Sequence, residues 1–322
     1  MIREQQLVTR EHQRSFELFG TSVRILAGGE PAEGAPPAEL AIAAAEAVLR
    51  ACHLELSRFD PDSELSHLNA DPEPARLSSR LTAGAVAAAI HAAERSGGLV
   101  DPTLIGALEA AGYAESRRNA IPASLADALR AAPPRRAAAP SHGALWRTVF
   151  AAGREIRRPP GVRLDLGGTA KGFAADRAAA SLAGQGAFAV DAGGDIVLGG
   201  VDEMPRRVTV AHPLDDRPAL EFDLAAGAVA TSGIGTRIWR TGPGFAHHLL
   251  DPSTGRPAWT GVVQATAVGS TGLEAETLAK TALLLGPQRG LRVLEPNGGA
   301  LVLDDGHVLI AGPLRARAVE VV

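Results

Sequence analysis

The chain has 322 residues, of which 46% are hydrophobic, so it can fill a large core and is not a disordered protein. Its net charge of −4 argues against a protein that holds nucleic acid through broad neutralisation of phosphates. Its single cysteine, Cys52, excludes an intrachain disulfide and a cysteine-rich zinc site, and its apolar surroundings predict a buried thiol.

The first half of the chain reads as one strand followed by long helices. An opening strand is predicted over residues 16–27 and a long helix over 36–59, where apolar residues recur at helical spacing. Residues 59–69 are expected to form a loop. A second helix over 81–97 should end at Gly97 and Gly98. Residues 131–142 are interpreted as an irregular surface insertion.

From Trp146 onward, short β-branched runs separated by turn residues predict strands. They are expected over 146–150, 154–158, 187–194, 195–200, 206–213, 219–225, 227–233, 262–270, 300–305 and 307–312. Helices are expected over 173–184 and around Glu276. The alternation favours an α+β fold with mostly antiparallel sheets and packed helices, in a single domain over residues 1–322.

The N-terminal twenty residues are polar and charged and lack the apolar run of a signal peptide. No stretch is long and apolar enough to span a membrane. We therefore expect a cytoplasmic protein without membrane insertion.

The only lysines among the 32 basic residues are Lys171 and Lys280. In a chain that uses Arg almost everywhere, a retained Lys suggests a position that needs a compact ammonium, although chance retention stays open. Lys171 lies in DLGGTAKGF, residues 165–173, where glycines precede a helix whose first N–H groups suit an anion. The alternative is an ordinary glycine-rich helix entry, because no P-loop or dinucleotide fingerprint is matched.

Three further segments have a functional and a structural interpretation. VDAGGDIVLGG, residues 190–200, allows close approach of backbone to a ligand or forms a tight hairpin. His247 and His248 should face opposite sides of a strand, so one of them can serve as a base in a cleft or bond to a carbonyl. Thr231–Gly233 has the same ambiguity.

Glu276 and Lys280 fall at positions i and i+4 of one helix face, in the order that favours an ion pair. Most such pairs lie on the surface. Because this helix is otherwise apolar, the pair is expected to face a pocket.

Together these segments resemble the family of FAD:protein FMN transferases, also called the ApbE family. The matching stretches arrive in the family's order and cover nearly the whole chain: 19–21, 57–69, 100–103, 165–173, 191–196, 231–233, 248–257 and 275–286. The resemblance implies an α+β fold, related to the T-fold, that holds FAD as substrate in a cleft. It also implies cleavage of FAD between its phosphates, transfer of FMN to an exposed Thr or Ser of an acceptor protein, and release of AMP.

The same resemblance assigns roles to residues. Phe19 and Phe59 would flank the rings, and His248 would be the general base. The other residues expected at the FAD site are Asp101, Asp165, Lys171, Thr231, Ser232, Leu250 and Lys280.

Most members also hold a divalent metal through an Asp, a Thr or Ser four residues later, and a backbone oxygen. The corresponding positions here are Glu276, Lys280 and Gly168. An ammonium cannot ligate a cation, so Mg²⁺ binding at Gly168 and Glu276 is in question. We expect the Lys280 ammonium to stand in the metal's place; otherwise Lys280 points away and Mg²⁺ binds elsewhere. Two other activities fit the same site: FAD binding without transfer, and hydrolysis of FAD to FMN and AMP.

Overall fold

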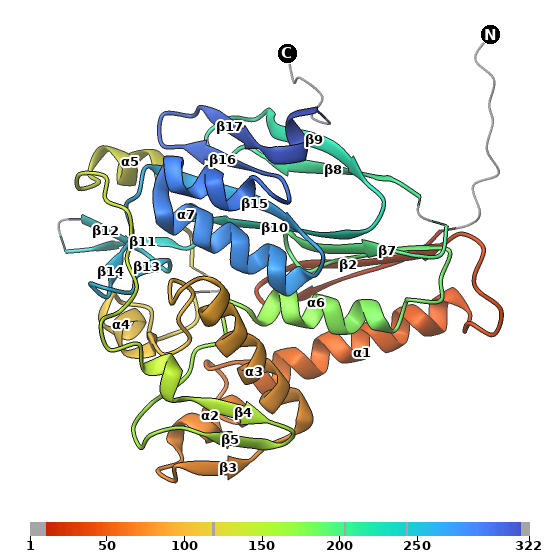
Figure 1. Cartoon of the computed structure of the whole chain (residues 1–322), viewed down its shortest axis with the longest axis horizontal. Coiled ribbons are helices and arrows are strands. Elements are labelled where there is room, and N and C mark those ends of the chain that lie inside the picture. The colour runs from red at the N-terminus through yellow and green to blue at the C-terminus, as the bar shows by residue number, and fades with distance from the viewer. Residues whose placement is uncertain (1–10, 118–119, 203, 243, 317–322) are drawn as a thin grey trace.

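The computed structural model describes residues 11–117, 120–202, 204–242 and 244–316 (Figure 1). Its largest element is an eight-stranded sheet with the strand order β1-β2-β6-β7-β10-β15-β16-β17, in which every neighbouring pair is antiparallel. The strands are β1 (His12–Leu18), β2 (Thr21–Gly28), β6 (Ala187–Asp191), β7 (Asp195–Gly199), β10 (Gly227–Gly233), β15 (Val262–Gly269), β16 (Gly299–Leu303) and β17 (Val308–Ala311). The predicted α+β class with antiparallel pairing is confirmed.

Helices cover one face of this sheet (Figure 1): α1 (Ala38–Leu56), α6 (Ala170–Ala180) and α7 (Gly272–Leu294). In α1 the buried positions recur at helical spacing, among them Ile42, Leu49 and Cys52. They pack with Val23 and Ile25 of β2 in the largest core cluster. The expectation that Cys52 is a buried apolar residue is confirmed, with 1% of it exposed.

A β-hairpin covers the opposite face of the sheet: β8 (Arg206–Ala211) and β9 (Pro218–Leu224). Val208, Leu220 and Phe222 are buried against Leu198 and Val229 of the large sheet. Alternate residues of the hairpin are therefore apolar and the residues between them are exposed, as expected of strands with one buried face.

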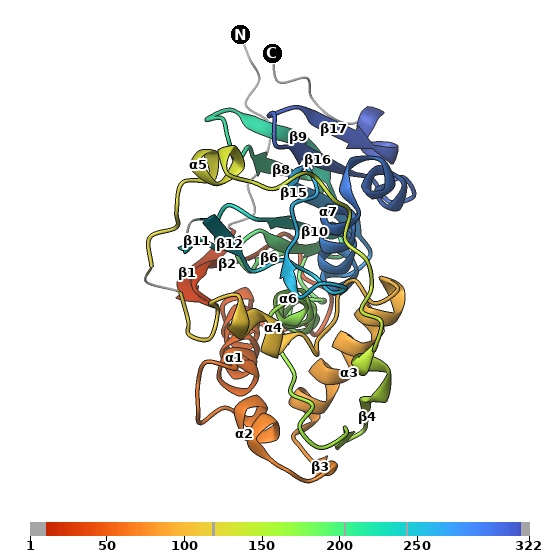
Figure 2. The same cartoon turned by 90° about the vertical axis from the view of Figure 1, so that its left-hand side faces the viewer.

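The remaining elements lie beneath α1 and α6 or at one end of the sheet (Figures 1 and 2). Those beneath are α2 (Glu64–Ala70), α3 (Arg80–Arg95) and a small sheet of β3 (Ala75–Leu77), β5 (Glu155–Arg157) and β4 (Phe150–Ala152). Those at the end are α4 (Ile105–Ala110), α5 (Leu125–Arg130) and the pairs β11 (Ile238–Thr241) with β12 (Gly244–His247), and β13 (Leu250–Asp251) with β14 (Arg256–Pro257).

Several predicted elements are confirmed. The helix expected over 36–59 is α1, and the helix expected over 81–97 is α3, which ends before Gly97 and Gly98 with φ of 64° and 89°. Residues 131–142, interpreted as an irregular insertion, form no helix or strand. Most of their side chains are exposed, but Ala138 is buried and donates its N–H to the Leu284 carbonyl.

Three expectations were wrong. The single strand over 16–27 is two strands, because the backbone turns at Phe19 and Gly20 with φ of 55° and 74°. The loop over 59–69 contains α2, which Ser63 caps by accepting a hydrogen bond from the Ser66 N–H. The strand over 146–150 begins only at Phe150, because Leu145–Thr148 form a turn of 3-10 helix.

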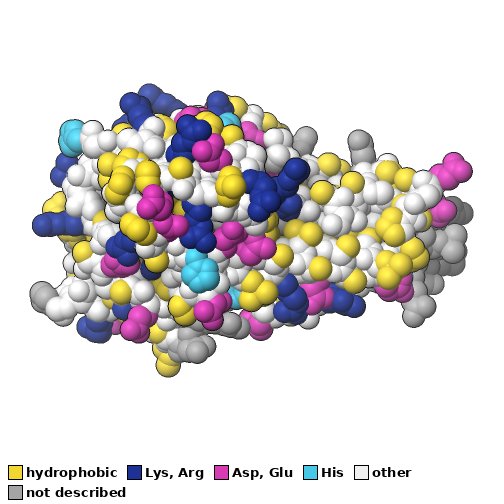
Figure 3. All heavy atoms as spheres, turned by 90° about the horizontal axis from the view of Figure 1, so that it is seen from below, with side chains coloured by type: hydrophobic (Ala, Val, Ile, Leu, Met, Phe, Trp, Pro, Cys, Tyr) yellow, Lys and Arg dark blue, Asp and Glu magenta, His cyan; other side chains and the backbone are white. Residues whose placement is uncertain are grey.

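On the face seen in Figure 3, basic and acidic side chains are interspersed among hydrophobic ones, so the residues drawn in colour there form no continuous basic patch. Among the described residues, no helix combines the length and the apolar character needed to cross a bilayer.

Glycines allow α6 and α7 to cross in close contact. A Cβ on Gly172 would lie 2.4 Å from the Gly272 carbonyl oxygen, so neither helix could keep its place with a larger residue there. Asp176 of α6 accepts hydrogen bonds from the N–H groups of Gly272 and Leu273, at 2.6 and 3.0 Å, and so caps α7. The crossing fixes the start of α6 against the start of α7.

Replacing Gly172 with alanine should therefore lower the free energy of unfolding by about 1–3 kcal/mol, because an added methyl meets backbone atoms. Thermal or urea unfolding measures the change. Gly106→Ala is the matched control, since Gly106 lies in α4 with open space around it. This substitution should leave the free energy of unfolding unchanged or raise it by up to about 1 kcal/mol. Equal stability of Gly172→Ala and the wild type would contradict the close crossing.

Candidate functional site

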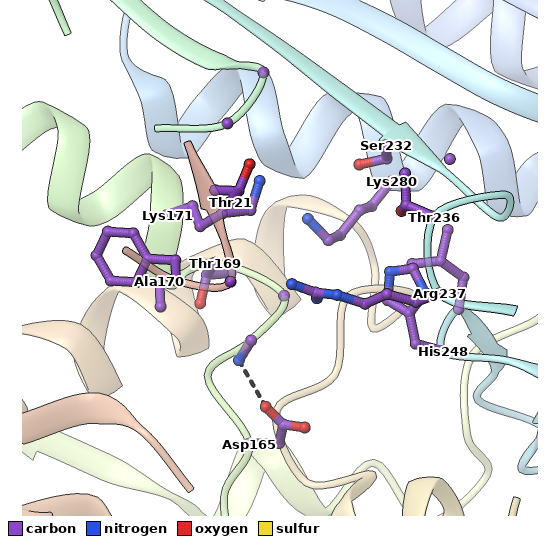
Figure 4. Close-up of a pocket in the computed structure, with 18 of the residues that line it drawn as sticks. Thr21, Asp165, Thr169, Ala170, Lys171, Ser232, Thr236, Arg237, His248 and Lys280 are labelled. Atoms are coloured by element: carbon purple, nitrogen blue, oxygen red, sulfur yellow. Dashed lines mark hydrogen bonds between the residues drawn. The ribbon is translucent and has the colours of Figure 1, made fainter. Parts of the chain in front are cut away.

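A cavity of about 920 Å³ brings most of the predicted site residues together. Figure 4 shows Lys171, Lys280 and Arg237 extending into the same space from different elements, with His248 beside Arg237. The predicted residues that line it are Phe19, Phe59, Asp101, Asp165, Gly168, Lys171, Thr231, Ser232, His248, Leu250 and Lys280. Glu276 does not line the cavity, because it is fully buried behind Lys280.

Lys171 lies in the first turn of α6, immediately after the glycine turn, and pairs with Asp195 at the start of β7. The Nζ–Oδ2 distance is 2.5 Å, and Asp195 is only 1% exposed. Burial disfavours the charge on Lys171, but Asp195 and Glu276 outweigh it and hold the pKa of Lys171 above its usual value. Lys171 is therefore a cation at neutral pH, with its charge compensated by a buried carboxylate.

Lys280 and Glu276 form a second buried pair on α7. Lys280 Nζ donates to Glu276 Oε1 at 2.8 Å, and the backbone N–H of Gly172 donates to Oε2 at 2.9 Å. Burial raises the pKa of Glu276, opposed by the charges of Lys280 and Lys171. Both oxygens of Glu276 are thus occupied. Lys280 lines the cavity, which contradicts the alternative in which it points out of the cleft.

These contacts do not fit a divalent metal. The Lys280 side chain passes beside Gly168, since a Cβ built there would lie 3.9 Å from Lys280 Cε. The two positions at which the resemblance places metal ligands, Gly168 and Glu276, are therefore bridged by an alkyl chain and its ammonium, which would repel a cation. In the described parts of the chain, no three His, Cys, Asp or Glu residues are arranged to hold a metal ion.

The glycine turn before α6 is held by Asp165. Its Oδ1 accepts from the Gly167 N–H at 2.6 Å (dashed in Figure 4), and its Oδ2 accepts from Arg58 Nε at 2.8 Å. Arg58 also donates to the Tyr113 carbonyl at 2.7 Å. Asp165 therefore braces the turn as well as lining the cavity.

Other predicted residues line the cavity with polar groups that already hydrogen-bond within the protein. Asp101 Oδ1 accepts from the N–H and the hydroxyl of Thr103, and burial raises the pKa of Asp101. Thr231 shares a 2.9 Å hydrogen bond with Thr266 across two strands. The segment 190–200 forms a hairpin, which was one of the two structures proposed for it. Its turn at Gly193 and Gly194 also lines the cavity.

Aromatic side chains form one wall. Phe59 and Tyr113 line the cavity and contact each other edge-on at 5.4 Å between ring centroids. Tyr113 stacks at 5.6 Å on Trp239, which is buried behind it. The Arg58 guanidinium lies 4.0 Å from the Phe59 ring. This wall offers flat apolar surface to a planar ring.

The two histidines have different surroundings, as the expected alternation implies. His247 is fully buried, packs edge-on against Trp259 and accepts from the Leu249 N–H at 3.3 Å. His248 is partly exposed and lines the cavity, and its Nδ1 has no hydrogen-bond partner among the described residues. Burial, with the charges of Arg237 and Lys280, holds the pKa of His248 well below its usual value. Its imidazole is neutral at neutral pH and able to accept a proton.

Sequence reasoning missed three cavity or supporting residues. Tyr113 is the only tyrosine of the chain, which could have marked it. Asp195 lies inside a matched motif, at positions 191–196, but nothing in the sequence pairs it with Lys171. Arg237 is one arginine among many and carried no signal.

The chain was compared with known proteins. The model of the ApbE family matches residues 19–303. The FAD:protein FMN transferase of Rhodobacter capsulatus is 31% identical over 94% of this chain and 57% of its own length. That of Vibrio cholerae is 32% identical over 46% of this chain and 47% of its own length, and that of Treponema pallidum is 29% identical over 88% and 82%. The matches thus span about half the length of the first two relatives.

Solved structures share the fold. The ApbE protein of Thermotoga maritima superposes with a TM-score of 0.78 and 25% identity, over 97% of this chain and 100% of that one. The flavin transferase ApbE of Vibrio cholerae superposes with a TM-score of 0.72 and 23% identity, over 96% and 99%.

Proposed function

The chain belongs to the ApbE family, and from this premise we propose that it cleaves FAD and attaches FMN to a Thr or Ser of an acceptor protein. The Rhodobacter capsulatus and Treponema pallidum relatives bear the name of that activity. The observation that carries the proposal is the single cavity in which cations, a neutral imidazole and an aromatic wall meet. A dinucleotide that carries a planar ring and a pyrophosphate needs these three features.

In the proposed reaction, the acceptor hydroxyl oxygen attacks the phosphorus on the flavin side of the pyrophosphate. The new P–O bond forms as the bond to the bridging oxygen breaks, and AMP leaves with that oxygen. His248 takes the hydroxyl proton, because its neutral imidazole lines the cavity. Lys171 lines the cavity and keeps two N–H donors beyond its bond to Asp195, and these donate to the phosphate oxygens.

One assay separates this function from its two alternatives. The full chain is incubated with FAD and a candidate acceptor that carries an exposed Thr or Ser, and AMP release and acceptor mass are followed. A mass gain equal to bound FMN supports transfer. Free FMN with unmodified acceptor indicates a pyrophosphatase, and unchanged FAD with tight binding indicates a flavin-binding protein.

We also propose that the Lys280 ammonium, paired with Glu276, occupies this point of the cavity in place of Mg²⁺. The support is the occupied carboxylate of Glu276 and the position of the Lys280 chain beside Gly168. Wild-type turnover should then persist in excess chelator. Loss of turnover with chelator, restored by Mg²⁺, would contradict this proposal.

The converse change should create a metal site. Glu276→Asp together with Lys280→Thr restores the side-chain pattern common in the family and removes the repelling ammonium. Calorimetric titration should detect Mg²⁺ binding to this double variant and none to the wild type, and FMN transfer by the variant should require Mg²⁺. The identity of the acceptor and the cytoplasmic location stay predictions.

A further inference from the structure

The two lysines of the cavity do not bring net positive charge to it. Lys171 is paired with Asp195, and Lys280 with Glu276, and both carboxylates are at most 1% exposed. Two cations and two anions in close contact sum to zero, so their field on a ligand is weak. The pyrophosphate of FAD carries two negative charges that these pairs leave uncompensated.

Arg237 differs from both lysines. It follows β10 and immediately precedes β11, it is partly buried, and its guanidinium extends into the cavity beside Lys280 and His248 (Figure 4). Within the described residues, no carboxylate pairs with it and no side-chain hydrogen bond to its guanidinium is formed. A guanidinium carries five N–H donors in a planar fork that matches phosphate oxygens.

The other arginines of the cavity are already committed. Arg58 pairs with Asp165 and bonds to the Tyr113 carbonyl. Arg117 donates to the Gly112 carbonyl and lies 4.4 Å above the Trp239 ring. Both brace the aromatic wall, which leaves Arg237 with its full hydrogen-bonding capacity directed at the cavity.

We propose that Arg237 is the residue that binds the pyrophosphate of FAD, by bidentate hydrogen bonds to the phosphate that leaves as AMP. This inference rests on the function proposed above and adds a substrate-binding residue to it. When the bridging P–O bond breaks, the AMP phosphate gains charge, and the guanidinium donors stabilise that charge. Arg237 thereby does for the leaving group what a cation ligated by the protein would otherwise do.

Arg237 also affects the proton acceptor, His248. Its charge helps to hold the pKa of His248 low, after the larger effect of burial, so the imidazole beside it stays neutral. One guanidinium would thus bind the leaving phosphate and keep the adjacent base unprotonated. Neither role is open to Lys171, whose ammonium is held by Asp195.

The test compares ligands with and without the pyrophosphate. Affinities of the full chain for FAD, AMP, inorganic pyrophosphate and riboflavin are measured by fluorescence or calorimetry for the wild type and Arg237→Gln. FAD and pyrophosphate should each bind about 10- to 100-fold more weakly to Arg237→Gln, the usual effect of removing a charge-assisted bidentate contact. Riboflavin should bind equally well to both proteins, because it carries no phosphate.

Arg240→Gln is the matched control. Arg240 lies three residues further along the chain in β11, with its side chain 73% exposed and stacked on Phe245 outside the cavity. Its FAD affinity should equal that of the wild type. Arg237→Lys keeps the charge without the planar fork, so its FAD affinity should lie between those of the wild type and Arg237→Gln. Such a graded loss separates the effect of the fork from a folding defect.

Three results have distinct meanings. Unchanged FAD and pyrophosphate affinity in Arg237→Gln and Arg237→Lys overturns the role of Arg237 alone. Parallel loss of riboflavin affinity overturns it as well, since the effect is then structural. If the wild type binds FAD but does not transfer FMN, the transfer function is contradicted, and the affinities alone decide the binding role of Arg237. If the wild type binds no FAD, both proposals are contradicted.

Discussion

Replacing His248 with alanine should lower the rate of FMN transfer by about 10²–10⁴-fold, the usual contribution of a general base. FAD affinity should change little, because the cations and the aromatic wall remain in place. Initial rates of acceptor labelling at saturating FAD measure the first quantity, and FAD titration the second. His91→Ala is the control, because His91 is exposed on α3 outside the cavity. Transfer by His248→Ala within about threefold of the wild type would rule out the general base role.

The pH dependence of the wild-type rate tests the same role. Because burial and the neighbouring charges hold the pKa of His248 well below about 6.5, the imidazole stays neutral as the pH falls through that value. The rate should therefore show no midpoint near pH 6.5 and should decline only in more acidic solution. Measuring transfer from about pH 8 down to about pH 5 checks this, and a midpoint near 6.5 would show an unperturbed base.

Replacing Lys280 with methionine should lower the free energy of unfolding by about 3–5 kcal/mol near neutral pH, because it leaves the fully buried carboxylate of Glu276 without its cation. Adding Glu276→Gln should recover much of that loss, since a neutral amide can still accept from the Gly172 N–H. Urea unfolding of the two single variants and the double variant forms the double-mutant cycle.

The exposed pair on α1 provides the control. Arg50→Met removes a partner of Glu46 at the same spacing, but Glu46 keeps 16% of its side chain exposed and still bonds to Arg14, so the cost should stay below about 1 kcal/mol. The deficit of Lys280→Met should also shrink on acidification. Folding raises the pKa of Glu276, so protonation favours the folded state, and that contribution is lost as the pH rises through the folded value. A deficit that is constant between about pH 8 and about pH 5 would contradict the charged, unpaired carboxylate.

Local patterns were sufficient for the long elements of the fold. The helical spacing of Ile42, Leu49 and Cys52 predicted α1, and the glycines at 97 and 98 marked the end of α3. The seven-residue helix α2 was missed because so short a helix has little stability of its own and depends on burying Leu65 and Leu68 against other elements. The turn at Phe19 was missed because a phenylalanine with positive φ has no sequence signature.

The site divides in the same way. Motif residues such as Lys171, His248 and Lys280 could be nominated from their spacing and their resemblance to a family, and the structure brings them to one cavity. Partners that come from another helix or strand could not be predicted. The pairing of Lys171 with Asp195 joins α6 to β7, and Gly172 meets Glu276 because two helices cross at glycines.

Chain order and residue chemistry alone sufficed for the α+β class, the main helices and strands, and the anomaly of a lysine at a position where a ligand oxygen is common. Spacing along one helix also predicted that Glu276 and Lys280 pair, because i and i+4 are neighbours on any helix. Ion pairs between residues of different helices and strands could be identified only from the tertiary structure. Whether a cation is neutralised depends on which carboxylate folding brings beside it, and that distance is set by packing rather than by separation in the chain. For this reason Lys171 proved to be paired with Asp195. Arg237, unremarkable in the sequence, proved to line the cavity with neither a carboxylate nor a hydrogen-bond partner at its guanidinium among the described residues.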